Sequence, residues 1–451
     1  MPGVASGLVS RLVTGLIGWA GGIFHDIERT GPPLPDGPVL LTANHANALL
    51  DPLVVFEAAG RPSRPLAKAP LFEHPIIGPF LWALGGLPVY RRQDDPAQMG
   101  RNRDTFDAAV RALHRGEVVQ IYPEGQSHSE PGLTPLKTGA ARIALQAEEQ
   151  AGWTLGLTIV PCGITYQRKH RFRSSALLAA GTAIPVAPWR GAWEADPAAA
   201  AEGLTDAVRA GLEAVTLNFV ADGDRELVDV AEALYARATR QASWTERPGL
   251  AARWPRLRAF TAGLAWLRAH DPDRHARLSH RVRRYARLST LLGADEWGVP
   301  ERYRWGRAVA HALERGAWLA LLTPLALVGV VAWILPYQLP NLAVRVVRPS
   351  LDAIATYKLV AAVLAFPLAL AAWSWLIAHH HGAGWGAVAA VAAVAGGLVW
   401  IPWRKALRDL GADARALVRA LPRERTRERL AELRAELVRE FEAVAERAGT
   451  V

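Results

Sequence analysis

The sequence predicts an α/β domain, a sheet flanked by helices, followed by an α-helical C-terminal half with membrane-spanning helices. Strand-like apolar runs alternate with helical patterns over residues 36–220, which is typical of α/β layers. Apolar segments at 317–335, 359–377 and 385–403 each approach the ~20 residues that cross a bilayer. The expected regions are an interfacial N-terminal helix (1–30), the α/β domain (31–225), an Arg-rich helical region (226–310), hydrophobic membrane segments (311–405) and a charged C-terminal helix (406–451).

Composition narrows the class of protein. The 451 residues carry a net charge of +10 and a pI of about 10.1, which suits anionic lipid headgroups or nucleic acid. No paired Cys/His finger motif accompanies the charge, so a membrane is the favoured partner and nucleic acid rests on pI alone. The single cysteine, Cys162, excludes an internal disulfide framework, fits a reducing compartment and is expected to be an inert buried thiol.

The N-terminal segment 4–24 is largely apolar but contains Arg11. Its uninterrupted run, 12–24, is shorter than a spanning helix, and no convincing cleavage site follows. We expect a helix lying in the headgroup region, with an ordinary buried helix as the alternative.

Three segments of the α/β domain carry polar side chains just after expected strands. His45 and Asp51 follow the strand 38–42, and a carboxylate near a histidine can fix its tautomer and stabilise the imidazolium. The paired arginines Arg91 and Arg92 follow the extended piece 87–90, and an arginine fork matches phosphate oxygens.

The third segment follows the strand 118–122, which is preceded by the helix 104–114. It carries Glu124, Gly125, Ser127 and Lys137 before the helix 140–150. Its backbone amides, with Lys137, could face an anion. Because strand-end loops converge at one edge of an α/β sheet, His45, Arg91 and Glu124 are expected to meet there.

The C-terminal half combines arginine-rich and apolar stretches. The stretch 281–288, RVRRYARL, predicts a positive face toward lipid phosphates, with a solvated helical face as the alternative. Positive charges flank the second and third apolar segments, which predicts a hairpin with both ends in the cytoplasm. The first segment has positive charge on both sides and contains Pro324, so an interfacial or re-entrant path is expected. The histidines at 379–381 predict an exposed linker rather than a metal site, and 406–451 predicts a solvated helix or helix pair.

Taken together, four blocks resemble the glycerolipid acyltransferase superfamily, which includes lysophosphatidate and glycerol-3-phosphate acyltransferases. They are NHANALLD (44–51), GGLPVYRR (85–92), PEGQS with LTPLKTG (123–139), and IVPCGITY (159–166). Their order and spacing match the family over roughly residues 25–225, which implies an acyltransferase domain with a glycerolphosphate acyltransferase-like sheet. Five residues separate His45 from Asp51 where four are commoner, and Pro88 stands where an aromatic residue is frequent.

The resemblance implies a mechanism and its residues. His45 would be the general base on a glycerol hydroxyl, and Asp51 would orient it. The hydroxyl would attack an acyl-CoA or acyl carrier protein thioester directly. Substrate-binding roles would fall to a larger set of side chains: Asn44, Arg91, Arg92, Glu124, Gly125, Ser127 and Lys137.

The resemblance implies neither a cofactor nor a metal. The expected partners are the thioester, a glycerol-phosphate acceptor (glycerol 3-phosphate or 1-acylglycerol 3-phosphate) and membrane lipid, with no nucleic acid. The expected location is the cytoplasmic membrane, with the site on its cytoplasmic face. Two alternatives stay open: an acyltransferase for another lyso-lipid in phospholipid remodelling, and a catalytically silent lipid-binding scaffold.

Overall fold

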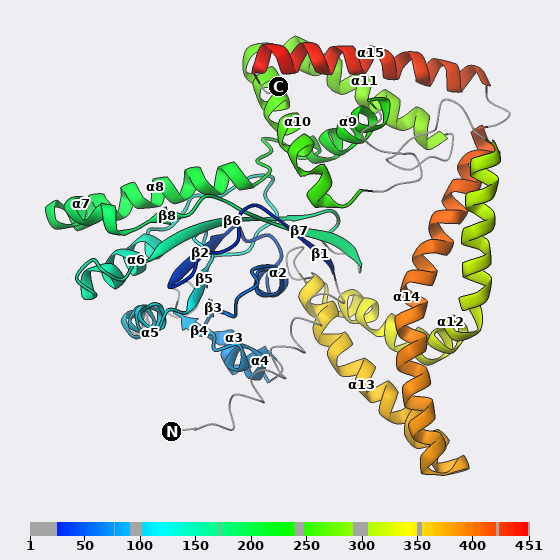
Figure 1. Ribbon diagram of the computed structural model, residues 1–451, viewed down its shortest axis with the longest axis horizontal. Helices are drawn as coiled ribbons and strands as arrows, with labels where there is room; N and C mark the ends of the chain where they lie inside the picture. Colours follow the sequence, from blue (N-terminus) through cyan, green and yellow to red (C-terminus); the bar gives the residue numbers. More distant parts are fainter. Residues whose placement is uncertain are drawn as a thin grey trace. The chain divides into compact units, whose positions relative to one another are not determined.

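The computed structural model describes residues 25–449 apart from 76, 91–101, 170, 172, 240–247, 292–304, 350–353 and 421–423 (Figure 1). The chain divides into two compact units. The first contains residues 1–218, 249–251 and 348–360, and the second contains 219–248, 252–347 and 361–451. The first unit therefore recruits two short segments from beyond the predicted boundary at 225.

The first unit is built on an eight-stranded sheet in the order β1-β7-β6-β2-β5-β3-β4, with β8 paired to β6. The strands pair in parallel except where β6 meets β7 and β8. Their bounds are β1 His25–Thr30, β2 Val39–Ala43, β3 Ser63–Lys68, β4 Leu87–Val89, β5 Val118–Ile121, β6 Thr158–Tyr166, β7 Ser174–Ala180 and β8 Ile184–Pro185.

Helices cover both faces of this sheet, because its central strands are apolar on both sides. Leu40 of β2 packs toward the face that α5, α6 and α8 cover, whereas Val39 and Leu41 face α2. The helices of this unit are α2 Leu50–Ala58, α3 Pro70–Glu73, α4 Ile77–Ala83, α5 Asn102–His114, α6 Gly139–Gln150, the 3-10 turn η2 Ala187–Trp189, α7 Arg190–Ala195 and α8 Pro197–Val215.

The predicted α/β order is confirmed, but three strands differ from expectation. Residues 25–30 form the edge strand β1 rather than the end of an interfacial helix, and 1–24 lie outside the described residues. β1 has the sequence HDIERT and pairs with β7 through its backbone. Its charged side chains do not form the apolar pattern that predicts a strand from sequence. β3, which the sequence shows only as a short basic stretch, and β7 (SSALLAA) also lack an alternating pattern.

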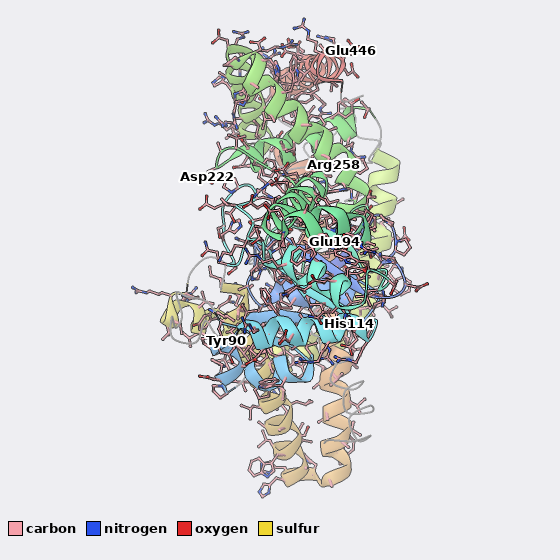
Figure 2. All side chains as sticks on the ribbon, turned by 90° about the vertical axis from the view of Figure 1, so that its left-hand side faces the viewer. Tyr90, His114, Glu194, Asp222, Arg258 and Glu446 are labelled. Carbon is pink, nitrogen blue, oxygen red and sulfur yellow. The ribbon has the colours of Figure 1, made fainter. Side chains whose placement is uncertain are left out.

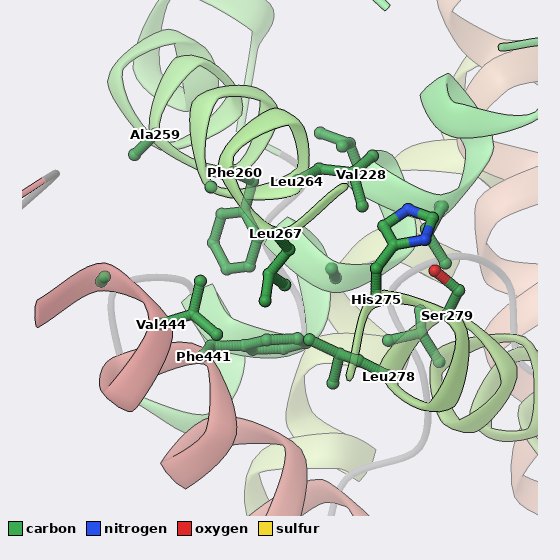
Figure 3. Close-up of a pocket in the computed structure, with 15 residues that line it drawn as sticks. Val228, Ala259, Phe260, Leu264, Leu267, His275, Leu278, Ser279, Phe441 and Val444 are labelled. Carbon is green, nitrogen blue, oxygen red and sulfur yellow. The ribbon is translucent and has the colours of Figure 1, made fainter. Parts of the chain in front are cut away.

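In the second unit, four helices enclose one apolar core: α9 Asp224–Ala238, α10 Leu250–His270, α11 Pro272–Leu291 and α15 Glu424–Ala448. Charged side chains such as Arg258 and Glu446 are exposed on this bundle (Figure 2). A cavity of about 90 Å³ opens among Phe260, Phe441 and other apolar side chains (Figure 3). The C-terminal helix α15 thus shares a core with helices of the Arg-rich region.

Among the described residues, three helices are long and apolar enough to cross a membrane, and all lie in this unit except for the first turns of α13. These stretches are Leu313–Val347 in α12 (Trp305–Val347), Ile354–His381 (α13) and Ala383–Gly411 in α14 (Ala383–Ala420). Helix α12 runs unbroken through Pro324. The interfacial or re-entrant path of this segment stays a prediction. α12 and α14 approach closely at Gly329 and Gly396, where a Cβ added to Gly329 would lie 2.2 Å from the Gly396 carbonyl oxygen.

Candidate active site

The site begins where β2 ends and α2 starts. His45 Nδ1 lies 2.8 Å from Asp51 Oδ2, so the wider spacing between these residues still brings them together. Asp51 is fully buried, and its Oδ2 also accepts the backbone N–H of Asn47 at 2.8 Å. Its Oδ1 accepts the hydroxyl of Tyr166 at 2.6 Å. Three donors therefore fix the carboxylate in one orientation.

This arrangement determines what the imidazole can do. Because a carboxylate accepts from Nδ1, that nitrogen carries the proton and Nε2 is left as the basic nitrogen. The His45 side chain is 18% exposed, and its ring stacks on Tyr122 with centroids 4.2 Å apart. Burial, with the nearby Asp51 charge, raises the pKa of Tyr166 well above its ordinary value, so its hydroxyl remains a donor at neutral pH.

A second carboxylate holds the backbone of His45. Glu124 Oε1 accepts the His45 N–H at 2.8 Å. Its Oε2 accepts from the Thr134 N–H and hydroxyl, at 2.9 and 2.8 Å, and from His128 Nε2. His128 in turn donates its backbone N–H to the His45 carbonyl at 3.0 Å. The 124–128 turn therefore holds both the N–H and the carbonyl of His45.

The charge states of this clamp follow from its hydrogen bonds. Burial opposes ionisation of Glu124, but the bonds from His128, Thr134 and His45 outweigh it and lower the pKa of this carboxyl. The bond to Glu124 raises the pKa of His128. Glu124 is thus an ionised, buried group that positions the His45 backbone.

The structure brings together the predicted residues of the first and third motifs. β2 and β5 are parallel neighbours with Thr42 opposite Ile121, so His45 and Glu124 follow at the same edge, as expected. Asn44 bonds both backbone groups of Ile164, accepting its N–H at 2.6 Å and donating to its carbonyl at 3.1 Å. These contacts tie the His45 loop to β6. They use the side-chain amide of Asn44, which was expected to bind substrate.

The remaining predicted residues lie in the third motif or outside the described residues. Gly125 has φ +75°, and an added Cβ would lie 2.5 Å from Lys137 Nζ, so the lysine amine passes directly over this glycine. Ser127 lies in the same turn, next to His128. Arg91 and Arg92 fall in the segment 91–101, outside the described residues, so their predicted meeting with His45 is untested.

Sequence reasoning missed Tyr166 and His128, which bond to the Asp51 and Glu124 carboxylates. Tyr166 ends both the fourth motif and β6, the neighbour of β2, so its position at the end of a strand was an available signal. His128 stands four residues after Glu124. Within the described ranges, no group of three His, Cys, Asp or Glu side chains is arranged to hold a metal ion.

Comparison with known proteins supports the motif resemblance. Residues 25–165 match the family model described as Acyltransferase. The chain is 42% identical over 85 residues to glycerol-3-phosphate O-acyltransferase 2 of Saccharomyces cerevisiae, covering 19% of this chain and 11% of that protein. It is 26% identical over 166 residues to 1-acyl-sn-glycerol-3-phosphate acyltransferase of Neisseria gonorrhoeae, covering 37% of this chain and 58% of that one. The chain therefore spans less than two thirds of the length of these relatives.

One solved structure is also similar. It is the 1-acyl-sn-glycerophosphate acyltransferase PlsC from Thermotoga maritima, at 16% identity and a TM-score of 0.33. The match covers 45% of this chain and 80% of that one.

Proposed function

From the acyltransferase-family domain at residues 25–165, we propose that this protein moves a fatty acyl group onto a glycerol-phosphate acceptor in phospholipid synthesis. The donor is acyl-CoA or acyl carrier protein, and the acceptor is glycerol 3-phosphate or 1-acylglycerol 3-phosphate. The observation that carries this proposal is the His45–Asp51 pair, joined at 2.8 Å with the opposite ring nitrogen available as a base.

The proposed reaction follows from that geometry. His45 Nε2 takes the proton of the acceptor hydroxyl as its oxygen attacks the thioester carbonyl carbon. The tetrahedral intermediate collapses, the carbon–sulfur bond breaks, and the imidazolium returns its proton to the thiolate. One positioned base contributes ~10²–10⁴-fold in rate, and holding the two reactants in line can remove ~7–11 kcal/mol of barrier.

The other predicted residues fall into two roles in this proposal. Lys137, with Arg91 or Arg92, binds the acceptor's phosphate. Gly125 and Ser127 help to bind its polyol. Asn44 and Glu124 position the His45 loop, because their polar atoms bond to backbone groups. This reassignment makes the buried carboxylate a support for the base instead of a substrate ligand.

We place the enzyme in the cytoplasmic membrane with its active site on the cytoplasmic face. Three membrane-length helices support membrane residence. Arg345, Arg348 and Lys358 precede the body of α13, and Arg404 and Lys405 follow the apolar part of α14, which supports cytoplasmic ends for this hairpin. A lipid product would then leave directly into the bilayer.

The test is acyl transfer by the purified full-length protein in detergent. Thiol release from acyl-CoA is measured with glycerol 3-phosphate, lysophosphatidate and an uncharged lyso-lipid, and the acylated product is identified. His45→Ala should retain at most a few per cent of activity while folding normally, whereas His270→Ala, an exposed histidine of the other unit, should be unaffected. Full activity in His45→Ala would show that His45 is not the general base. If the wild-type protein shows no turnover, the catalytically silent lipid-binding scaffold becomes the favoured function.

A further inference from the structure

We propose that the exposed arginines of α11 dock the helical bundle of the second unit onto a membrane surface of anionic lipid. The sequence alone left two interpretations of this stretch, a face toward lipid phosphates and a solvated face. The structure separates the arginines of α11 that pair with a neighbouring helix from those that are exposed. The inference rests on the proposed membrane residence and is independent of acyl transfer.

Two arginines of α11 serve the bundle itself. Helices α11 and α15 lie side by side (Figure 1), and Arg281 forms ion pairs with Glu436 and, at 3.1 Å, with Glu440 of α15. Arg274 lies 3.9 Å from the second carboxylate oxygen of Glu440. On the opposite side of the same helix, Tyr285 is buried in the apolar core. Arg274 and Arg281 are therefore engaged at the seam between the two helices.

The other arginines of α11 lie on its outer face. Arg277, Arg284 and Arg287 are exposed, and we call them the arginine stripe. With the exposed His280 they follow one another at intervals of three, four and three residues, which places them on one side of a helix. Arg283 is exposed next to this stripe. Within the described part of the chain, no ion pair joins these four arginines to an acidic side chain.

The stripe carries charge of one sign only. Its arginines repel one another at these spacings, and the single acidic residue of α11, Asp273, lies in the first turn. Helix α15 offers a comparison within the same bundle. Its exposed charged side chains include both signs: Glu428, Arg429, Glu432, Glu436, Arg439 and Glu442. Mixed charge is typical of a solvated helix, whereas a positive stripe is stabilised by an anionic partner.

The bundle is joined at both ends to the apolar helices of its unit. Only residues 292–304 separate α11 from α12, and only 421–423 separate α14 from α15. The Trp403 indole N–H donates to the Leu319 carbonyl at 3.1 Å, so the end of the apolar part of α14 lies beside the start of that of α12. Both connections therefore leave the apolar helices at the same end, which keeps a lipid surface within reach of the stripe.

An anionic leaflet fits the stripe in charge and in chemistry. Arginine forks bind phosphate oxygens in a two-point geometry. One arginine near an anionic membrane surface strengthens the attraction about fivefold, so three together contribute about a hundredfold. The proposed topology places the end of α14 in the cytoplasm, where the leaflet carries anionic lipid. The stripe would then hold the bundle against that leaflet.

A fluorescent label on α11 tests the proposal in the full-length protein. Ala276→Cys places the label on the exposed side of the helix next to Arg277, and the native Cys162 does not compete because it is buried. The labelled protein is reconstituted into vesicles of phosphatidylcholine, with or without phosphatidylglycerol. Energy transfer from the label to an acceptor on the lipid headgroups is measured at about 0.1 M and about 1 M salt, where the Debye length is ~10 Å and ~3 Å.

Three variants are compared in this assay, each checked by a thermal melt. The first replaces the three arginines of the stripe with glutamine, and the second replaces them with lysine, which keeps the charge. The third is the matched control, because it removes the same charge from exposed positions on α10 and α15: Arg258→Gln, Arg429→Gln and Arg439→Gln.

We expect phosphatidylglycerol to raise the energy transfer at low salt, and high salt to reverse the rise. The glutamine variant of the stripe should lower the ratio of docked to undocked protein by about a hundredfold. The lysine variant should keep most of the rise, and the control variant should resemble wild type. An unchanged rise in the glutamine variant, an equal loss in the control, or the same transfer in neutral vesicles would each overturn the proposal. A stripe that binds an acidic protein instead would leave the transfer independent of lipid charge, which also overturns it.

Flotation separates this proposal from the proposed membrane placement. If the protein does not float with neutral vesicles, the assignment of membrane spans is wrong. Flotation with anionic vesicles alone, lost in the glutamine variant of the stripe, would still support docking by the stripe. If the protein floats with both kinds of vesicle but the transfer does not respond to lipid charge, only the stripe is rejected.

Discussion

Replacing Asp51 with asparagine tests the paired carboxylate with little change in shape. The amide oxygen can occupy the place of Oδ2 and accept from His45 Nδ1 and the Asn47 N–H, which now lie 2.8 Å away. The amide NH₂ can then face the Tyr166 hydroxyl, which can rotate to accept. The fold and the tautomer should therefore survive, and only the negative charge beside the imidazolium is lost.

The magnitude follows from that charge. Asp51 is fully buried and contacts the ring directly. A pair of unit charges roughly 4 Å apart at an effective dielectric of about 20 gains ~4 kcal/mol. At ~1.4 kcal/mol for each factor of ten, losing the carboxylate should lower kcat by about 10³-fold. KM should change little, because the imidazolium forms only as the reaction proceeds.

The assay is thiol release from acyl-CoA with each acceptor, beside a thermal melt followed by circular dichroism. Asp51→Asn should fold with a melting temperature near that of wild type and show the loss in kcat alone. An Asp51→Asn protein that keeps more than about a tenth of the wild-type kcat would refute the reasoning, because the carboxylate would then contribute too little to be stabilising an imidazolium.

Three further predictions follow from the same unit. Tyr166→Phe removes the 2.6 Å hydrogen bond to Asp51 Oδ1 and should lower the free energy of unfolding by about 1.5–3 kcal/mol. Its loss in kcat should be smaller than that of Asp51→Asn, and an unchanged melting temperature would contradict the prediction. Ala48 has φ +37°, so Ala48→Gly should raise the melting temperature by about 2–4 °C at unchanged kcat, and a drop would show that the loop is not strained. Burial lowers the pKa of His25 to about 4, so the folded state excludes a proton that the unfolded chain binds below about 6.5. Stability should fall as pH drops from 6.5 to 4, by up to ~1.4 kcal/mol per pH unit, and His25→Asn should make that slope shallower.

The sequence predicted those site residues that lie close together in the chain or directly after strands. His45 and Asp51 stand on either side of one loop, and the expectation that Glu124 joins them rested on two parallel strands ending at one edge. Tyr166 comes from more than a hundred residues later, and only the pairing of β6 beside β2 brings it to Asp51.

Other differences arise where tertiary contacts override local pattern. The charged strand β1 owes its conformation to backbone pairing with β7, which composition does not reveal. The place of the C-terminal helix α15 likewise depends on tertiary contacts. Its apolar positions, including Leu430, Leu437 and Phe441, complete the core of α9–α11.

The predicted boundary at 225 shows how the proposed active site depends on the later part of the chain. The segment 348–360 belongs to the first unit, and within it Ala355 and Leu359 pack with Leu50 and Leu53 of α2. The Thr356 hydroxyl also accepts the Leu49 N–H at 3.3 Å, just before the helix that carries Asp51. These two leucines are each 1% exposed, and losing part of their burial would cost at most ~1.5–3 kcal/mol apiece, the range for full exposure. This segment contains the first turns of α13, so α2, the helix that carries Asp51, packs against the start of a candidate membrane span. A chain cut at 225 would therefore lose the packing that supports Asp51 together with its membrane helices.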